Sequence, residues 1–187
     1  MMRSVARRTW HRMTNLLRRV GSRRPPRPLL YVLDLPSRVA LPRRRVNVQF
    51  REVTEEEVAR NPHQYAKNVE QRSDWIRLRG QCVAGFVDGR VVYHMWFRRA
   101  EGHQLAGLPG SWRPMGRVLF LYDGFTVPEV RGRGIHTGAV AWLVEQHGRN
   151  GIAHVLGYVN AANVAGRRAL ERIGFTCVGE MQGYDFA

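Results

Sequence analysis

The pattern of apolar and polar positions is most regular over residues 119–175, where it predicts alternating strands and helices. Residues 118–122 and 152–159 are short apolar runs, which is typical of buried strands. Between them, apolar residues recur at helical spacing over Ile135–His147, and a second short helix is expected after Asn163. This order of strand, helix, strand and helix indicates an α/β domain.

The chain before residue 118 shows the two-residue alternation of strands. Residues 81–87 and 90–98 flank Asp88-Gly89, a two-residue turn that predicts a β-hairpin. Residues 46–53 alternate apolar and polar side chains and predict a half-buried strand. Thr54-Glu55-Glu56-Glu57, which follows, has the form of a capping box and predicts the start of a helix.

The remaining segments are shorter or less regular. We expect a strand at 29–33, either the first of the sheet or an extra edge strand, and another at 175–181. We also expect a helical piece at 63–71, a long loop at 101–116 and, unless that edge is supplied otherwise, a short last strand at 184–186. Together these elements predict one domain over residues 29–187.

Charge divides the chain into two parts. The formal charge is +15, but residues 1–45 hold thirteen of the 30 basic residues and one of the 15 acidic residues, so the remainder carries only +3. The positive charge therefore belongs to an N-terminal arm and not to the domain. No apolar run of about eighteen residues occurs, so no transmembrane helix is expected.

The arm, residues 1–28, admits three interpretations. Apolar residues at helical spacing among arginines make residues 4–20 compatible with a basic amphipathic helix, which would lie on an anionic membrane or bind an acidic partner. An arginine-rich, acid-poor start also resembles an organelle transit peptide. The third interpretation is a flexible, solvated tail.

A glycine-bearing turn, Arg131-Gly132-Arg133-Gly134, lies between the strand at Val118 and the helix at Ile135. The first N–H groups of a helix lack partners within the helix, and the helix dipole makes that end positive. The two glycines let the backbone wrap closely around an anion, and the two arginines add positive charge. The sequence therefore predicts a pyrophosphate cradle, with an ordinary strand–helix turn as the alternative.

Two more specific phosphate-binding motifs do not fit this turn. A P-loop requires a lysine, and this turn contains none. A dinucleotide-binding fingerprint requires a third glycine, where Thr137 stands, and an acidic residue about twenty positions later, which is absent.

The wider pattern resembles a known family. Arg131-x-x-Gly134 after a strand, followed by Asn163, a short helix and Gly174-Phe175, is similar to the pattern of the GNAT acyl-CoA N-acyltransferases. The resemblance is strong over residues 119–175, looser back to about Val46 and absent before that. It implies an α/β fold whose central sheet is mixed and mostly antiparallel, splayed between the strands at Val118 and Ile152, and flanked by helices.

The resemblance also implies a site and a reaction. Acetyl-CoA would be the acyl donor, and an amine would attack it directly, without a covalent enzyme intermediate. The backbone of Phe125 and Val127 would pair with the pantetheine arm, one of their N–H groups would polarise the acetyl carbonyl, and Asn163 would bond the pantetheine or cap its own helix. The candidate cofactor-binding residues are Phe125, Thr126, Val127, Arg131, Gly132, Arg133, Gly134, Ile135, His136, Thr137 and Asn163.

Asp123 is the candidate general base. It lies on the predicted central strand, where many relatives carry a glutamate that faces the cleft. A carboxylate on an otherwise apolar strand is costly to bury, so it needs a partner or a purpose. The alternative is a strand-end aspartate that pairs with an arginine or bonds the turn at Gly124.

Two positions depart from the family's pattern. Leu170 stands where many relatives have a tyrosine that protonates the departing thiolate, so either water or Tyr158 is the acid, or activity has been lost. His136 stands where the motif has Gly or Ala, and its side chain would crowd the pyrophosphate or donate to it.

Cysteine and histidine spacing predicts no metal site. Cys82 and Cys177 lie in apolar, strand-like surroundings, so we expect both to be reduced core residues of a cytoplasmic protein. The side chains that would contact the acceptor are not determined by the sequence.

These observations predict an N-acyltransferase that transfers an acetyl group from acetyl-CoA to an amine. One alternative is a CoA-binding regulatory module with little or no catalysis, and another is a protein that binds a membrane or nucleic acid through its arm. We expect a cytoplasmic location, with peripheral membrane association and a homodimer left open, as are the acceptor and the acyl chain length.

Overall fold

The computed structural model describes residues 28–36, 46–65, 80–104, 108–110 and 112–181. The predictions for the arm, for the helical continuation beyond residue 65 and for a last strand at 184–186 lie outside these ranges. Within them, no helix is both long enough and apolar enough to cross a membrane.

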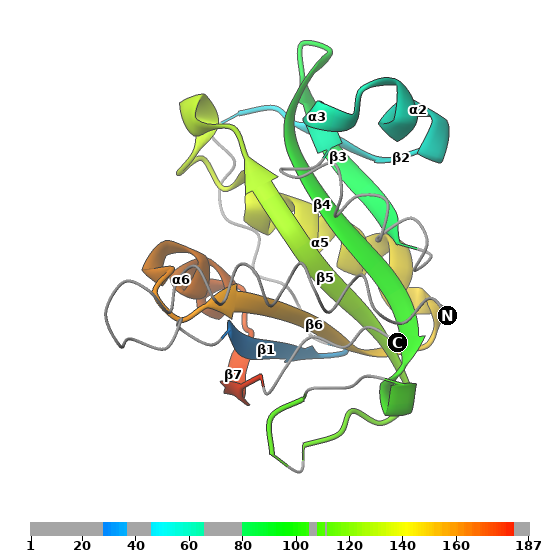
Figure 1. Cartoon of the computed structure of the whole chain (residues 1–187), viewed down its shortest axis with the longest axis vertical. Coiled ribbons are helices and arrows are strands. Elements are labelled where there is room, and N and C mark those ends of the chain that lie inside the picture. The colour runs from blue at the N-terminus through cyan, green and yellow to red at the C-terminus, as the bar shows by residue number, and fades with distance from the viewer. Residues whose placement is uncertain (1–27, 37–45, 66–79, 105–107, 111, 182–187) are drawn as a thin grey trace, which may run out of the picture.

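A seven-stranded sheet forms the centre of the molecule (Figure 1). Its strands are β1 (Pro28–Asp34), β2 (Gln49–Val53), β3 (Gln81–Val87), β4 (Arg90–Glu101), β5 (Arg117–Thr126), β6 (Ile152–Asn160) and β7 (Thr176–Glu180). They lie in the order β2-β3-β4-β5-β6-β1-β7, and all neighbours are antiparallel except β5 and β6. The prediction of a mixed, mostly antiparallel sheet is confirmed.

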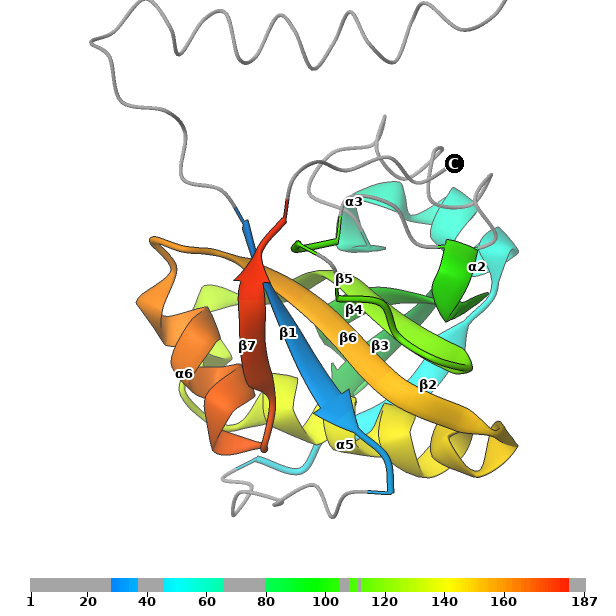
Figure 2. The same cartoon turned by 90° about the horizontal axis from the view of Figure 1, so that it is seen from below.

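Helices cover both faces of this sheet (Figure 2). The helices α5 (Ile135–His147) and α6 (Val164–Arg172) pack on one face, and the short helices α2 (Glu55–Arg60) and α3 (Pro62–Tyr65) lie on the other. Short 3-10 turns complete the connections: η1 (Gly102–Gln104), η2 (Pro128–Val130) and η3 (Gly148–Asn150).

The strand β5 contributes to two cores because its side chains alternate between the faces. Leu119 and Leu121 join the core beneath α5 and α6, whereas Phe120 and Tyr122 join the core beneath α2 and α3. A strand that is buried on both faces reads as a continuous apolar run, which is why its position in the chain was predictable.

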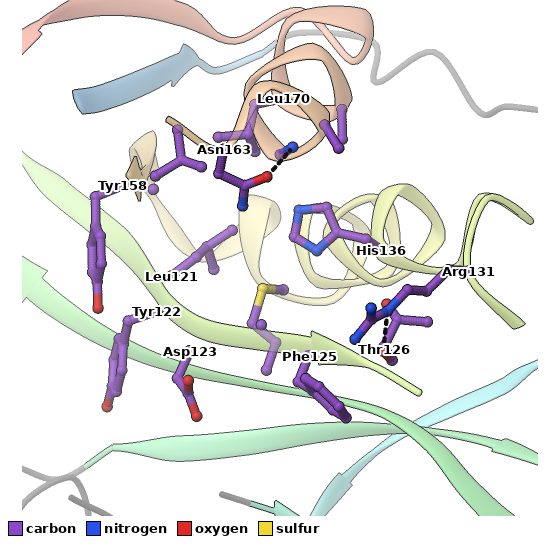
Figure 3. Close-up of a pocket in the computed structure, with 17 residues that line it drawn as sticks. Leu121, Tyr122, Asp123, Phe125, Thr126, Arg131, His136, Tyr158, Asn163 and Leu170 are labelled. Carbon is purple, nitrogen blue, oxygen red and sulfur yellow. Dashed lines mark hydrogen bonds between the residues drawn. The ribbon is translucent and has the colours of Figure 1, made fainter. Parts of the chain in front are cut away.

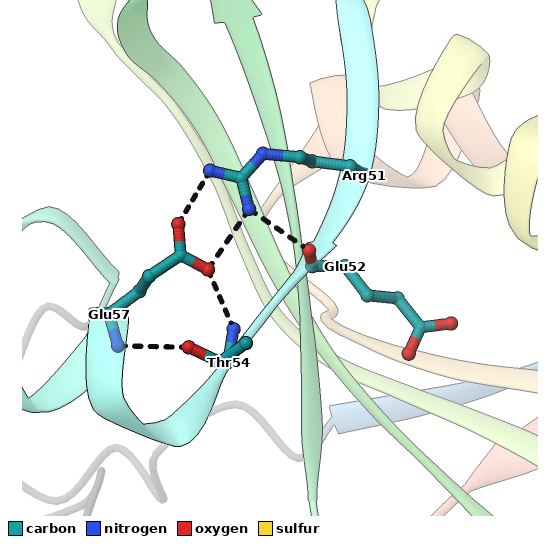
Figure 4. A network of polar contacts seen from close by, with 4 residues as sticks. All are labelled: Arg51, Glu52, Thr54 and Glu57. Carbon is teal, nitrogen blue, oxygen red and sulfur yellow. Dashed lines mark hydrogen bonds and ion pairs between the residues drawn. The ribbon is translucent and has the colours of Figure 1, made fainter.

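Two local predictions are confirmed in detail. Asp88 and Gly89 both have positive φ, 49° and 75°, as the tight turn of a two-residue hairpin requires. Thr54 caps α2, and its hydroxyl accepts from the Glu57 N–H while the Glu57 carboxylate accepts from the Thr54 N–H (Figure 4). Arg51 reaches the same carboxylate at 2.6 Å, and its hydrogen bond is the largest cause that lowers the pKa of Glu57 to about 2.

The position of β1 differs from the prediction that it could be an extra edge strand. It lies inside the sheet, between β6 and β7, and pairs with both. Tyr31 in its middle is 0% exposed. A local apolar pattern shows that a strand is buried but not which neighbours it pairs with, so the sequence left this open.

The two cysteines have different environments. Cys82 is buried, as predicted, but Cys177 is exposed, so the prediction that it is a core residue is wrong. The reason is that Cys177 lies on the edge strand β7, of which no residue is fully buried.

The central parallel pair separates partway along its length. The pairing of β5 with β6 runs from Arg117 opposite Ile152 to Leu121 opposite Gly157 and then ends, while β5 continues to Thr126 against β4. This confirms the predicted splay, and it leaves one edge of β5 unpaired beyond Leu121.

Candidate functional site

A cavity of about 500 Å³ occupies the gap between β5 and β6 (Figure 3). Of the predicted site residues, Asp123, Phe125, Thr126, Arg131, His136 and Asn163 line it. Figure 3 shows Asn163 and Leu170 of the α6 region on one side of the cavity, and Asp123 and Phe125 of β5 on the other. The structure therefore brings together residues from the central strand, the glycine-bearing turn and α6.

A β-bulge in β5 sets the direction of Asp123. His94 pairs with Phe125 and Trp96 pairs with Tyr122, which leaves one extra residue in β5 between the two pairs. Asp123 has φ 46°, a left-handed conformation that aspartate tolerates better than most residues. The Asp-Gly dipeptide inside an apolar run is the sequence signal for this bulge.

The carboxylate of Asp123 faces a histidine. Its side chain is 13% exposed, and Oδ2 lies 3.5 Å from Nε2 of His94. Among the described residues no arginine pairs with Asp123, so the interpretation of a structural Asp–Arg pair gains no support. The sequence placed His94 on the predicted hairpin but did not reveal its contact with Asp123, because a contact across a bulge depends on strand register, which local periodicity does not show.

The glycine-bearing turn has the shape of an anion cradle. Gly134 is the N-cap of α5, with φ 77° and no side-chain cap, so the N–H groups of Ile135, His136 and Thr137 have no partners within the helix. Gly132 has φ 72°, and a Cβ at that position would meet nothing within 4 Å. The exposed side chain of Arg131 donates to Thr126 O at the end of β5, at 2.9 Å, and that of Arg133 donates to Glu129 O in η2, at 3.4 Å.

The backbone N–H groups of both predicted pantetheine-pairing residues, Phe125 and Val127, point away from the cavity. The Val127 N–H donates to Val92 O at 3.0 Å, so it is engaged with the β4 side, and Val127 does not line the cavity. Phe125 lies two positions earlier in the same register, so its N–H also points toward β4. Thr126 faces the other way, since its carbonyl accepts from Arg131, and its backbone N–H points toward the cavity.

Asn163 is an N-cap, as one of its two interpretations predicted. Its Oδ1 accepts from the Gly166 N–H at 2.9 Å, at the first turn of α6. The side-chain nitrogen is free to face the cavity that Asn163 lines (Figure 3). A bond from this nitrogen to pantetheine stays a prediction.

His136 lies inside the cavity against β4 and β5. Its Nδ1 is 2.9 Å from the Tyr93 hydroxyl, and a Cβ at Gly124 would lie 3.4 Å from the ring. Burial lowers the pKa of His136 to about 4, so the ring is neutral near pH 7. The partly buried ring packs against Gly124 of the bulge, whereas Gly132 of the turn has nothing within 4 Å of its Cβ position, so the ring does not crowd the turn there.

The position of the missing tyrosine is apolar. Leu170 is 6% exposed and lines the cavity beside Ala169, so it offers no hydroxyl to a leaving group. Tyr158, the alternative acid, also lines the cavity, and its ring stacks on Phe120 with centroids 6.0 Å apart.

The residues present suit coenzyme A. The molecule needs an anion site for its pyrophosphate, and the uncapped start of α5 with two glycines and two arginines provides one. Its extended pantetheine arm needs a strand edge with free backbone groups, and β5 beyond Leu121 provides that edge. Among the described residues, no group of three or more His, Cys, Asp or Glu side chains could hold a metal ion.

Solved structures share this fold at low sequence identity. A predicted acetyltransferase from Clostridium acetobutylicum, solved with acetyl-CoA, is 13% identical with a TM-score of 0.52, and the match covers 74% of this chain and 96% of that one. The aminoglycoside N-acetyltransferase AAC(6')-Iy, solved with CoA, is 15% identical with a TM-score of 0.53, covering 74% of this chain and 97% of that one. A conserved protein of unknown function from Staphylococcus epidermidis is 13% identical with a TM-score of 0.58; the match covers 88% of this chain but only 62% of that longer one.

The fold is thus shared with solved acetyltransferases. A family model described as the acetyltransferase (GNAT) family matches residues 43–175, which is most of the chain. The chain belongs to this family. A search of curated proteins gave no match.

Proposed function

We propose that the protein is an N-acetyltransferase that transfers the acetyl group of acetyl-CoA directly to an amine. One observation carries the proposal: a single cavity joins the uncapped N-terminal region of α5 to the carboxylate of Asp123 at the bulge of β5. An anion site and a proton acceptor that border the same cavity are what this reaction requires.

The turn before α5 and the free edge of β5 would hold the donor. Amides of residues 131–137 would bind the pyrophosphate, and the Thr126 N–H would take the pairing role that Val127 cannot take. Acetyl-CoA supplies an activated acyl group whose leaving thiol has a pKa of roughly 8.5, as for cysteine, so the leaving group needs little help from an acid.

Asp123 would accept the proton of the acceptor. An alkyl amine with a pKa of about 10.4, the value for lysine, is an ammonium ion near pH 7 and cannot attack until it loses a proton. Asp123 lines the cavity and is the candidate to take this proton. The reaction then needs no nucleophile from the protein, in keeping with the burial of Cys82 and the exposed edge position of Cys177.

Calorimetric titration of acetyl-CoA and of free CoA into the full chain tests the donor site first. Saturable binding of both is expected, followed by release of CoA thiol when a small alkyl amine, an amino sugar or a peptide with a free N-terminus is added. A folded protein that binds neither acetyl-CoA nor CoA would contradict the proposal.

Leu170 supports a second candidate, a CoA-binding regulatory module. A buried leucine where many relatives have an acid removes a catalytic group but leaves the cradle intact. The same titration separates the two: a regulatory module binds acetyl-CoA but releases no thiol with any amine of the panel. If the protein is a regulatory module, Leu170→Tyr is expected to create thiol release with an amine. If it is an enzyme, the wild type already shows this release.

A further inference from the structure

The imidazole of His94 is fixed by a backbone carbonyl on α3. Its Nδ1 lies 3.0 Å from Gln64 O. A carbonyl oxygen only accepts hydrogen bonds, so Nδ1 carries a hydrogen. In the neutral ring Nε2 is therefore an acceptor.

This acceptor faces a second one. Nε2 lies 3.5 Å from Oδ2 of Asp123, and neither atom has a hydrogen-bond partner among the residues that the structure describes. The His94 side chain is only 3% exposed, so water cannot readily supply the missing donor. Two buried acceptors in contact are unfavourable until a proton lies between them.

Packing holds the pair in place. The His94 ring stacks on the ring of Phe125, with centroids 5.7 Å apart and planes 27° apart. Cys82 on β3 and Tyr93 on β4 also interact with the Asp123 charge, but burial raises the pKa of both groups, so both stay neutral. Among the described residues, His94 is thus the basic group that is in direct contact with this carboxylate.

We propose that His94 is a positioning residue that makes Asp123 the proton acceptor of the reaction. The inference rests on the proposed acyl transfer. An N–H bond of the bound ammonium breaks, its electron pair stays on nitrogen for attack on the acyl carbon, and the proton goes to the Asp123 carboxyl. That proton then lies between Oδ2 and His94 Nε2, which removes the repulsion between the two acceptors. His94 does not line the cavity and acts through Asp123.

A double-substitution cycle tests this role. His94→Asn keeps an N–H for Gln64 O but has no counterpart of Nε2, and Asp123→Asn removes the proton acceptor. We expect His94→Asn alone to lower kcat by about 10- to 100-fold, part of the total of about 10²–10⁴-fold that general acid–base catalysis supplies. The KM for acetyl-CoA should not change. In the Asp123→Asn background the same substitution should cost nothing further.

The exposed His103 on η1 provides a matched control, and His103→Asn should behave like the wild type. Equal losses of kcat from His94→Asn in both backgrounds would show a merely structural role and overturn the inference.

Urea denaturation of the four proteins of the cycle gives a readout that does not depend on activity. The shifts in its midpoint should be non-additive, and additive shifts would also overturn the inference. A wild type that binds acetyl-CoA yet releases no thiol would instead contradict the proposed function.

Discussion

The backbone at Asp123 limits which substitutions can test its role. Its φ of 46° is strained for most residues but tolerated by Asp and Asn. Asp123→Asn should therefore be at least as stable as the wild type, since an amide N–H can donate to the Nε2 acceptor of His94. Turnover should fall by about 10²-fold or more, because the proton acceptor is gone. Asp123→Ala should lose a further 1–2 kcal/mol, roughly, in the free energy of unfolding.

The two variants together separate chemistry from strain. Calorimetry should give the same acetyl-CoA affinity for Asp123→Asn and the wild type, since the cradle is built from backbone groups of the turn before α5 and not from Asp123. Turnover of Asp123→Asn equal to that of the wild type would remove Asp123 as the base.

His136 makes stability depend on pH in a predictable direction. Its pKa of about 4 in the folded protein lies below the value of 6.5 for an ordinary histidine, so between these pH values the unfolded chain binds more protons. The stabilisation from the neutral ring is complete above about pH 6.5 and is lost as the pH falls toward 4. Over this range we expect the free energy of unfolding to fall by roughly 1–2 kcal/mol more in the wild type than in His136→Ala. This value is smaller than the full pKa difference would give, because the ring is only partly buried.

Urea denaturation at several pH values measures this difference. Burial also lowers the pKa of His147, so both proteins should lose stability on acidification, and the comparison of slopes isolates His136. Parallel slopes for the two proteins would contradict the assignment.

At the residue scale the sequence predicted the loop glycines, the N-cap Asn163 and the position of Asp123 on the central strand. These depend on local chemistry: positive φ, capping and a carboxylate in an apolar run. It did not predict that the Val127 N–H is engaged or that His94 faces Asp123. Both depend on the register between β4 and β5, which a bulge shifts by one residue.

At the scale of elements, the turn before α5 should matter more for binding than for folding. Gly134 and Gly151 both end or begin a helical segment with positive φ, 77° and 74°. Alanine at either position should cost about 1 kcal/mol of stability, because each would place a Cβ in a left-handed conformation. Only Gly134→Ala should also weaken CoA binding. The backbone N–H groups that follow Gly134 form the cradle, and strain at Gly134 would shift them.

Calorimetric titration of CoA into both variants is the measurement, with Gly151→Ala as the matched control. An equal effect on CoA affinity would show that backbone strain, and not the cradle, is responsible.

The capping box of α2 gives an element-scale prediction about stability. Thr54→Ala removes the hydroxyl that accepts from the Glu57 N–H, and it should lower the free energy of unfolding by about 1 kcal/mol. Thr54→Ser keeps the hydroxyl and should be close to the wild type. The midpoint of urea denaturation measures both variants, and equal midpoints for alanine and serine would contradict the predicted contribution of the cap.

At the scale of the whole molecule, the place of β1 predicts how far the N-terminus can be shortened. The described sheet begins at Pro28, whose carbonyl accepts from the Met181 N–H. Removal of residues 1–27 should leave folding and CoA binding intact, whereas removal of residues 1–34 should unfold the domain because β1 joins β6 to β7.

Circular dichroism and CoA titration of the two truncated proteins test this prediction. Loss of CoA binding on removal of residues 1–27 would instead assign the arm a part in the site, and attention would turn to its anionic partners.

The sequence predicted the class of the fold and, through the family resemblance, the splay between the two central strands, but not the order of the sheet. Strand positions follow from apolar runs and turn residues, which are local. The pairing of β1 with β6 and β7 depends on which strand edges are still unpaired when the other strands have come together. That is a property of the whole sheet and not of any local segment.

The place of β1 also orders the steps by which the site is assembled during synthesis. Its residues leave the ribosome before those of any other described strand, yet Tyr31 bonds Glu171, 140 positions later. Contacts so distant in sequence form late, because the loop that they close is costly in entropy. The hairpin of β3 and β4 can form as soon as it is made, but β1 must wait for β6 and β7. Since residues of β6 and α6 also line the cavity, the nascent chain can complete the cavity only after α6 has been synthesised.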